Sequence, residues 1–192
     1  MPEIRPVTTL PQVDRWIEFD YCRRVRHDKD RIGVHFFEDD YKFERAWTSP
    51  NRYAAQLKQF GAVLGPDFSQ YMDFPDAISI YNHYRNNWLA SFWQTCYNID
   101  VIPTVLWGEE RTWDWCFDGY PKNSIVAVSN VGLVRKPEVK KMFHAGYEEM
   151  LRRLDPSLVL VFSRNAEKLP GNVQYIPWSI HKGDQLDGRG TE

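Results

Sequence analysis

The chain has 192 residues, of which 43% are hydrophobic and 15% aromatic, and its formal net charge is −2. This composition excludes intrinsic disorder, and the length suits one well-buried core better than two. The near-neutral charge gives no global attraction to nucleic acid or to anionic lipid, so a nucleic-acid partner is less expected than other partners.

The N-terminal residues 1–31 are expected to form an irregular arm and a charged segment, because they combine prolines with dense mixed charge. Residues 32–180 are predicted to form a single α/β domain. Residues 181–192 have no apolar periodicity, which predicts a flexible tail.

Five apolar runs, each stopping on a polar residue, predict strands between these ends. Continuous apolar runs are typical of parallel strands that are covered by helices on both faces. The sequence does not decide whether residues 173–176 form a sixth, short strand. The five predicted strands cover residues 32–37, 61–66, 101–107, 125–128 and 158–162.

Most intervals between the runs have helical spacing. A helical stretch over 43–60 is interrupted at Ser49-Pro50, where a second helix is expected to begin. The longest helix is predicted over 75–97. Its aromatic residues recur every three or four positions, so we expect Trp88 and Phe92 to be buried against the sheet.

The last helix is predicted to begin at Pro137 and to end before Asp155-Pro156. Its inward face is expected to carry apolar residues at 139, 143, 147, 150 and 154. No helical pattern fits the stretch from Glu109 to Ser124, and such a long loop is usually functional or mobile.

This alternation of strands and helices predicts the fold class. It indicates a mostly parallel five- or six-stranded sheet with flanking helices, in a Rossmann-like or an incomplete (β/α) barrel arrangement. In such sheets, ligands sit outside the carboxyl ends of the strands, and here those ends are acidic and rich in hydroxyls.

Carboxylates at the ends of the first two runs are the candidate catalytic residues, namely Asp39, Asp40 and Asp67. Only one of Asp39 and Asp40 is expected to point into a cleft, because adjacent residues point to opposite faces of a strand. Such carboxylates suit general acid and base chemistry, and oxygen ligands also suit Mg²⁺ or Mn²⁺. The alternative role is capping of helices and turns.

Five further residues are candidate ligand-binding residues. Ser69 and Glu109 end the second and third runs, and Ser129 ends the fourth. Arg85 lies among aromatic residues, where a buried salt bridge is the alternative to anion binding. Trp107 is either a stacking platform or part of the core.

Known nucleotide and metal motifs are missing from the sequence. It contains no GxxxxGK[ST], no GxGxxG after a strand, no GxSxG and no set of Cys and His with zinc spacing. The metal ligands, if there are any, are therefore unknown. The three cysteines are not spaced as pairs, which is typical of a reducing compartment. The N-terminus has no apolar leader, and no stretch approaches the ~20 apolar residues of a membrane span. A cytoplasmic protein without a membrane partner is therefore expected.

Several blocks of the chain carry a resemblance: GVHFFEDDYKFERAW, VLGPDFSQYMDFP, VIPTVLWGEERTWDWCFDG, and VAVSNVG followed by GYEEML. Across about residues 31–165, the chain resembles a family of uncharacterised proteins from phages and bacterial mobile elements. The resemblance implies a phage or mobile-element gene product, and it transfers no catalytic residue.

Three hypotheses for the function follow. In the first, the acidic ends of the strands bind a small phosphorylated, nucleotide-like ligand, with or without processing it. In the second, the protein only binds, as a counter-defence factor that sequesters a host signalling nucleotide or a host protein. In the third, it is a nucleic-acid module in replication or recombination, which the balanced charge disfavours.

Overall fold

A computed structural model describes residues 1–71, 73–131, 137–164 and 168–178. Within these residues the chain forms two parallel sheets, of four and three strands. The four-stranded sheet has the order β1-β2-β3-β4, and the three-stranded sheet has the order β5-β6-β7. The strands are β1 (Arg15–Glu18), β2 (Ile32–His35), β3 (Ala62–Leu64), β4 (Val101–Ile102), β5 (Ile125–Ser129), β6 (Leu158–Ser163) and β7 (Val173–Pro177).

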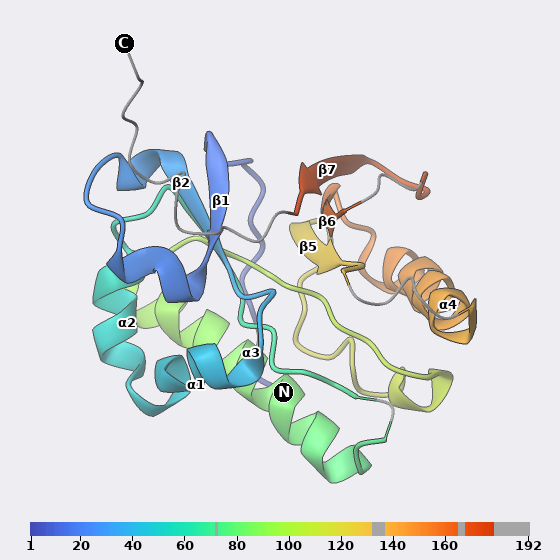
Figure 1. The fold of residues 1–192 in the computed structure, drawn as a ribbon. Coiled ribbons are helices and arrows are strands. Elements are labelled where there is room, and N and C mark those ends of the chain that lie inside the picture. The colour runs from blue at the N-terminus through green and yellow to red at the C-terminus, as the bar shows by residue number, and fades with distance from the viewer. Residues whose placement is uncertain (72, 132–136, 165–167, 179–192) are drawn as a thin grey trace.

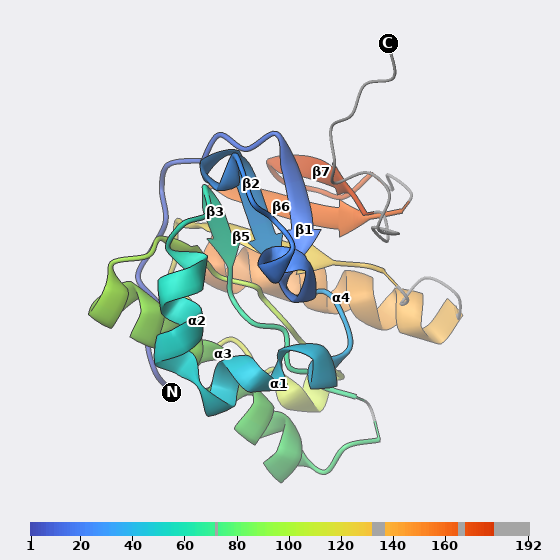
Figure 2. The same ribbon diagram turned by 60° about the vertical axis from the view of Figure 1, so that its left-hand side comes forward.

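Helices flank these sheets. Figures 1 and 2 show α1, α2 and α3 gathered on the side of the four-stranded sheet, whereas α4 accompanies the three-stranded sheet. Three short 3-10 helices lie in the connections. The α-helices are α1 (Asp40–Thr48), α2 (Pro50–Leu57), α3 (Asp76–Tyr97) and α4 (Pro137–Leu154), and the 3-10 helices are η1 (Phe19–Arg23), η2 (Lys29–Arg31) and η3 (Glu110–Thr112).

The two sheets are linked where the chain leaves β4. Thr104 forms a parallel bridge with Ala127 of β5. Next to this bridge, Val105 N donates to Ala127 O at 2.9 Å, and Ala127 N donates to Pro103 O at 2.8 Å. Because the pairing across this junction is also parallel, the carboxyl ends of β4 and β5 lie at the same edge.

The apolar core has two parts, one on each face of the strands. The larger part lies between the strands and the helices, and includes Val63 and Val101. The smaller part takes the alternate positions, Leu64 and Ile102, together with Leu160 and other residues from both sheets. Strands β2 to β6 are therefore buried on both faces, as their apolar sequences predict.

The expected single sheet of five or six strands differs from the two sheets that are observed. Strand β1 lies inside the segment that was expected to be only an arm and a charged stretch. Its sequence RWIE is short and surrounded by charges, so it has no apolar run. The space for β1 comes from Gly33 of the neighbouring strand β2. A Cβ atom at Gly33 would lie 2.4 Å from the ring of Trp16 in β1.

The expected helices are found, but α3 buries a different face from the one predicted. Trp88 and Phe92 are only half-buried, and they stack on each other with ring centroids 4.8 Å apart. Leu89, Ala90 and Trp93 are the fully buried apolar residues of this helix. The aromatic periodicity was misleading because much of the buried face of α3 is polar, as the site described below explains. The expected tail 181–192 lies outside the described residues.

Candidate functional site

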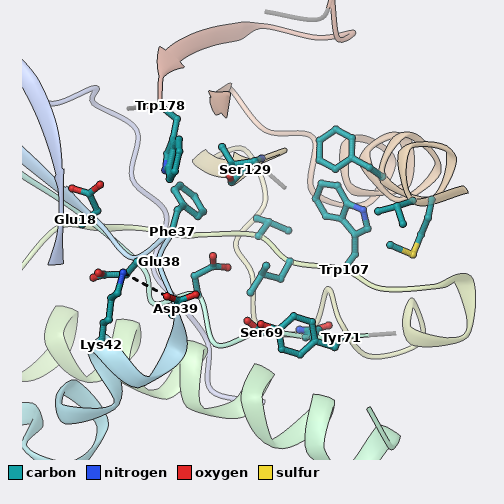
Figure 3. A pocket seen from close by; sticks show the side chains of 18 of the residues that line it. Glu18, Phe37, Glu38, Asp39, Lys42, Ser69, Tyr71, Trp107, Ser129 and Trp178 are labelled. Atoms are coloured by element: carbon teal, nitrogen blue, oxygen red, sulfur yellow. Dashed lines mark hydrogen bonds and ion pairs between the residues drawn. The ribbon is translucent and has the colours of Figure 1, made fainter. Parts of the chain in front are cut away.

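A pocket of about 690 Å³ opens at the carboxyl ends of the strands (Figure 3). We call it the rim pocket. Glu18 ends β1, Glu38 follows β2, Asp67 follows β3, and Ser129 ends β5. The full lining consists of Glu18, Phe37, Glu38, Asp39, Lys42, Asp67, Ser69, Gln70, Tyr71, Asp73, Val105, Leu106, Trp107, Ser129, Val131, Val139, Met142, Phe143 and Trp178.

The rim pocket has a polar side and an apolar side. Figure 3 shows Glu18, Glu38 and Asp39 on one side and Trp107 on the other. Trp107 packs against Phe143 of α4 with ring centroids 5.4 Å apart. It also lies directly on Gly146, where a Cβ atom would be only 2.1 Å from the Trp107 ring. Because Gly146 has no side chain, Trp107 can pack directly on α4. We call the packed rings of Trp107 and Phe143 the aromatic wall of the pocket.

Five of the eight candidate residues from the sequence line this pocket, namely Asp39, Asp67, Ser69, Trp107 and Ser129. Asp40 is not among the lining residues, and its carboxylate accepts hydrogen bonds from Ser69 N at 3.1 Å and Ser69 Oγ at 2.8 Å. Glu109 is outside the pocket and forms an ion pair with Arg111 at 3.0 Å. Asp39 lines the pocket and Asp40 does not, but strand alternation is not the reason: β2 ends at His35, and the two residues are the N-cap and the first residue of α1.

Arg85 also lies outside the pocket. Its guanidinium donates to both carboxylate oxygens of Glu44, at 3.0 and 2.9 Å, and to Asn82 Oδ1 at 2.7 Å. The same group lies 3.6 Å from the centroid of the Phe68 ring. Arg85 therefore takes the structural role that the sequence left open, because its charge is already paired.

Helix α3 holds the loop of residues 67–70, which we call the Asp67 loop. Asn86 accepts from Phe68 N at 2.8 Å and donates to Phe68 O at 3.2 Å. Asn82 donates to Ser69 O at 2.6 Å. Together with the Asp40 contacts, these bonds fix the loop from two sides, so the side chain of Asp67 is presented to the pocket by a rigid backbone.

Among the buried polar atoms of the pocket lining, four that belong to Asp67, Gln70 and Trp178 have no hydrogen-bond partner. They are Asp67 Oδ1, both amide atoms of Gln70, and Trp178 Nε1. Buried polar groups in folded proteins are nearly always hydrogen-bonded, and each exception calls for an explanation. Because all four atoms belong to one pocket, a ligand that supplies the missing partners is a single explanation for the whole set.

Burial dominates the electrostatics of this lining. It raises the pKa of the Asp67 carboxyl well above its usual value, and the nearby charge of Asp40 acts in the same direction. Burial likewise raises the pKa of Glu38 to about 7, although the hydrogen bond from Asp20 N lowers it in part. Carboxyl groups that can be neutral near pH 7 act as donors as well as acceptors.

No group of three or more His, Cys, Asp or Glu side chains suited to a metal ion occurs in the described part of the chain. The Mg²⁺ or Mn²⁺ considered from the sequence therefore stays a prediction.

The sequence did not single out Glu18, Glu38, Gln70 or Trp178 as site residues. Glu18 was missed because β1 itself was missed. Trp178 follows β7 directly, and its ring is covered by Arg164 at 4.5 Å. The rule that ligands gather at strand ends would have found both residues, had the two outer strands been predicted with certainty.

The fold and the pocket define an α/β protein of parallel strands with a ligand-sized cavity at their carboxyl edge. The chain belongs to the family described as a domain of unknown function (DUF4417), whose model matches residues 1–176. This confirms the resemblance noted from the sequence and extends it over the N-terminal segment.

Two relatives are phage proteins. The chain is 37% identical over 169 residues to the Gene 1 protein of Mycobacterium phage D29, covering 85% of this chain and 60% of that protein. It is 38% identical over 168 residues to the Gene 1 protein of Mycobacterium phage L5, covering 85% of this chain and 71% of that protein. The chain thus spans less than two thirds of the length of the D29 relative. No solved structure matches it. None of the described helices is long and apolar enough to cross a membrane.

Proposed function

We propose that this protein binds a small nucleoside-like ligand in the rim pocket, with the ring of the ligand against the aromatic wall. The observation that carries this proposal is the convergence of unpartnered polar atoms, from Asp67, Gln70 and Trp178, on one pocket. A volume of about 690 Å³ is in the range of small-molecule sites. Stacking of a base on an aromatic side chain contributes about 1–3 kcal/mol.

The charges of the lining revise the sequence hypothesis of a phosphorylated ligand. Five acidic residues line the pocket, namely Glu18, Glu38, Asp39, Asp67 and Asp73. Lys42 is the basic residue among the lining residues, and it is already 3.5 Å from Asp39. A phosphate group therefore has no free cation to bind in the described lining. In our proposal the base and sugar occupy the pocket, and any phosphate lies outside it.

Calorimetric titration with adenosine, cytidine, guanosine and uridine, and with their 5′-monophosphates, tests this function. We expect at least one nucleoside to bind with a Kd below 1 mM, and its monophosphate to bind no more tightly. Gln70→Ala should weaken this binding about tenfold or more, since a buried hydrogen-bonding partner is lost. Gln59→Ala is the matched control, because Gln59 is exposed and bonds Lys29 away from the pocket.

Absence of binding by all eight compounds would refute the proposal. Equal affinity of the Gln70→Ala variant would place the ligand elsewhere on the protein. Tighter binding of the monophosphates would restore the phosphorylated ligand of the sequence hypothesis. The counter-defence and nucleic-acid hypotheses stay predictions, because nothing in the described contacts bears on a macromolecular partner.

We also propose that the seven strands form one incomplete (β/α) barrel. Three observations support this arrangement: the strands follow chain order in each sheet, the Thr104–Ala127 bridge joins the sheets, and one apolar cluster takes residues from both. An aromatic contact between β1 and β6 adds to them, with the ring centroids of Trp16 and Phe162 5.3 Å apart. A crystal structure in which β4 and β5 do not pair, or in which the strand order reverses, would rule the barrel out.

A further inference from the structure

We infer that Asp67 and Gln70 act as two amide-like groups that recognise the donor–acceptor edge of an uncharged heterocycle, with Asp67 in its neutral acid form. This inference rests on the proposed function and names the chemical class of the bound edge. Such an edge carries a hydrogen-bond donor next to an acceptor, as in the ring N–H and carbonyl of a lactam or the ring nitrogen and amino group of an amidine.

The first support is the position of the two side chains. Asp67 and Gln70 come from the same short loop and line the same pocket. Asp67 Oδ1 and both amide atoms of Gln70 are buried without a partner. Asn82 and Asn86 of α3 and Asp40 of α1 fix the backbone between them. A preset pair of hydrogen-bonding groups favours a ligand edge of matching shape over a diffuse charge.

The second support is the set of charges around Asp67. Asp40 of α1 is the charged group that acts on it most closely, and Tyr120 of the β4–β5 loop also interacts with it. Arg85 of α3 is paired with Glu44, and Lys42 of α1 is paired with Asp39. Glu18 and Glu38 line the same pocket. With no unpaired cation among these groups to stabilise an ionised carboxylate, burial favours the neutral acid.

The protonation state decides what Asp67 can bind. A neutral carboxyl has one O–H donor and one carbonyl acceptor side by side, like a carboxamide. An ionised carboxylate has acceptors only, and it favours cations such as guanidinium or an edge with two donors. An acidic pocket would ordinarily suggest a cationic ligand, so the neutral form of Asp67 changes the expected class of ligand.

The substitution Asp67→Asn separates the two possibilities, because asparagine has the shape and the donor–acceptor pattern of the neutral acid. Calorimetry with adenosine, cytidine, guanosine and uridine is expected to give affinities for Asp67→Asn within about threefold of the unsubstituted protein. Asp67→Ala should lose about tenfold or more. Agmatine, a guanidinium compound with an apolar chain, should not bind.

Controls cover net charge and folding. Asp14→Asn makes the same side-chain change far from the pocket, where Asp14 pairs with Arg31, and should leave the affinity unchanged. The thermal midpoint of each variant checks that it folds. If Asp67→Ala does not fold, Asp67→Leu replaces it, since this change removes both carboxyl oxygens at similar size and should also cost tenfold or more.

The outcomes distinguish the inference from the function on which it rests. If nucleosides bind the unsubstituted protein but Asp67→Asn loses as much affinity as Asp67→Ala, the carboxylate is ionised and the inference is wrong while the function stands. Unchanged affinity of Asp67→Ala would also overturn the inference. If agmatine binds and no nucleoside does, both the function and the inference fail.

Discussion

Helices α3 and α4 pack on the strands in different ways. α4 follows the ordinary amphipathic pattern, with Phe143, Tyr147 and Met150 buried in the core. In α3, the buried residues of the first half are mostly polar, and its exposed face carries large apolar side chains instead. These exposed residues are Ile78, Ile80, Tyr81 and Tyr84.

The polar face of α3 forms hydrogen bonds to four other segments. Asn86 binds the Asp67 loop. His83 Nε2 and Asn87 Nδ2 both lie 2.9 Å from Asp118 O in the long β4–β5 loop. Gln94 accepts from Arg5 N at 2.7 Å and donates to Val101 O at 3.1 Å. Whereas α4 contributes core volume, α3 positions loops, and one of these loops carries Asp67.

The largest effect is expected at the apolar end of α3. Trp93 is fully buried and its Nε1 donates to Pro50 O at 3.2 Å, so Trp93→Ala should destabilise the protein by about 3–5 kcal/mol. Trp88→Ala should cost about half as much, because Trp88 is half-buried. Urea denaturation measures both changes. Equal losses would show that Trp88 belongs to the core as fully as Trp93 does.

Asn86→Ala should give the next largest effect. It leaves the N–H and the carbonyl of Phe68 buried without partners, which costs about 2–4 kcal/mol for the two groups. Asn51→Ala is the control, because Asn51 is exposed and accepts a hydrogen bond from the Tyr97 hydroxyl at the surface, so the expected loss is below about 0.5 kcal/mol. Similar losses for the two variants would mean that the polar face of α3 does not hold the loop.

Glu38 should make the stability depend on pH. Burial raises the folded-state pKa from an ordinary value of 4.5 to about 7, so between these values the folded state binds more protons than the unfolded state. The stability that this group contributes is present below about pH 4.5 and is lost as the pH rises through 7. Solvent screening at this half-buried position reduces the effect to about 1 kcal/mol. Denaturation of Glu38→Gln should show a flatter profile than the unsubstituted protein between pH 5 and 7.5, and parallel profiles would contradict this.

The smallest effect is expected on the exposed face of α3. Ile80 is 39% exposed, so Ile80→Ser should change the free energy of unfolding by no more than about 0.5 kcal/mol. Thermal denaturation measures the change. A loss above 2 kcal/mol would mean that another part of the protein covers this face.

The difference between the two helices also explains how far the sequence predicts the fold. Both α4 and its buried face were predicted, because apolar residues at helical spacing can be recognised from the sequence alone. The buried face of α3 was not, since asparagine and glutamine are satisfied by particular partners such as Phe68 and Arg5. β1 was missed for a similar reason: its place depends on the space above Gly33 of another strand.

The candidate site was predicted in location and only in part in composition. Asp39, Asp67, Ser69, Trp107 and Ser129 follow apolar runs, and strand direction alone brings them to one edge. The lack of partners at Asp67, Gln70 and Trp178 is a three-dimensional property that no sequence pattern records. The pairing of Arg85 with Glu44 likewise depends on how α1 and α3 pack, which the sequence leaves open.

The indole N–H signals in a ¹H–¹⁵N NMR spectrum test the central claim most directly. Trp178 Nε1 has no partner in the rim pocket, whereas Trp93 Nε1 is bonded to Pro50 O in the core. On titration with a nucleoside that binds, the Trp178 signal, assigned with Trp178→Phe, should shift and the Trp93 signal should stay in place. A spectrum in which Trp178 is unaffected at saturation would contradict ligand binding in this pocket.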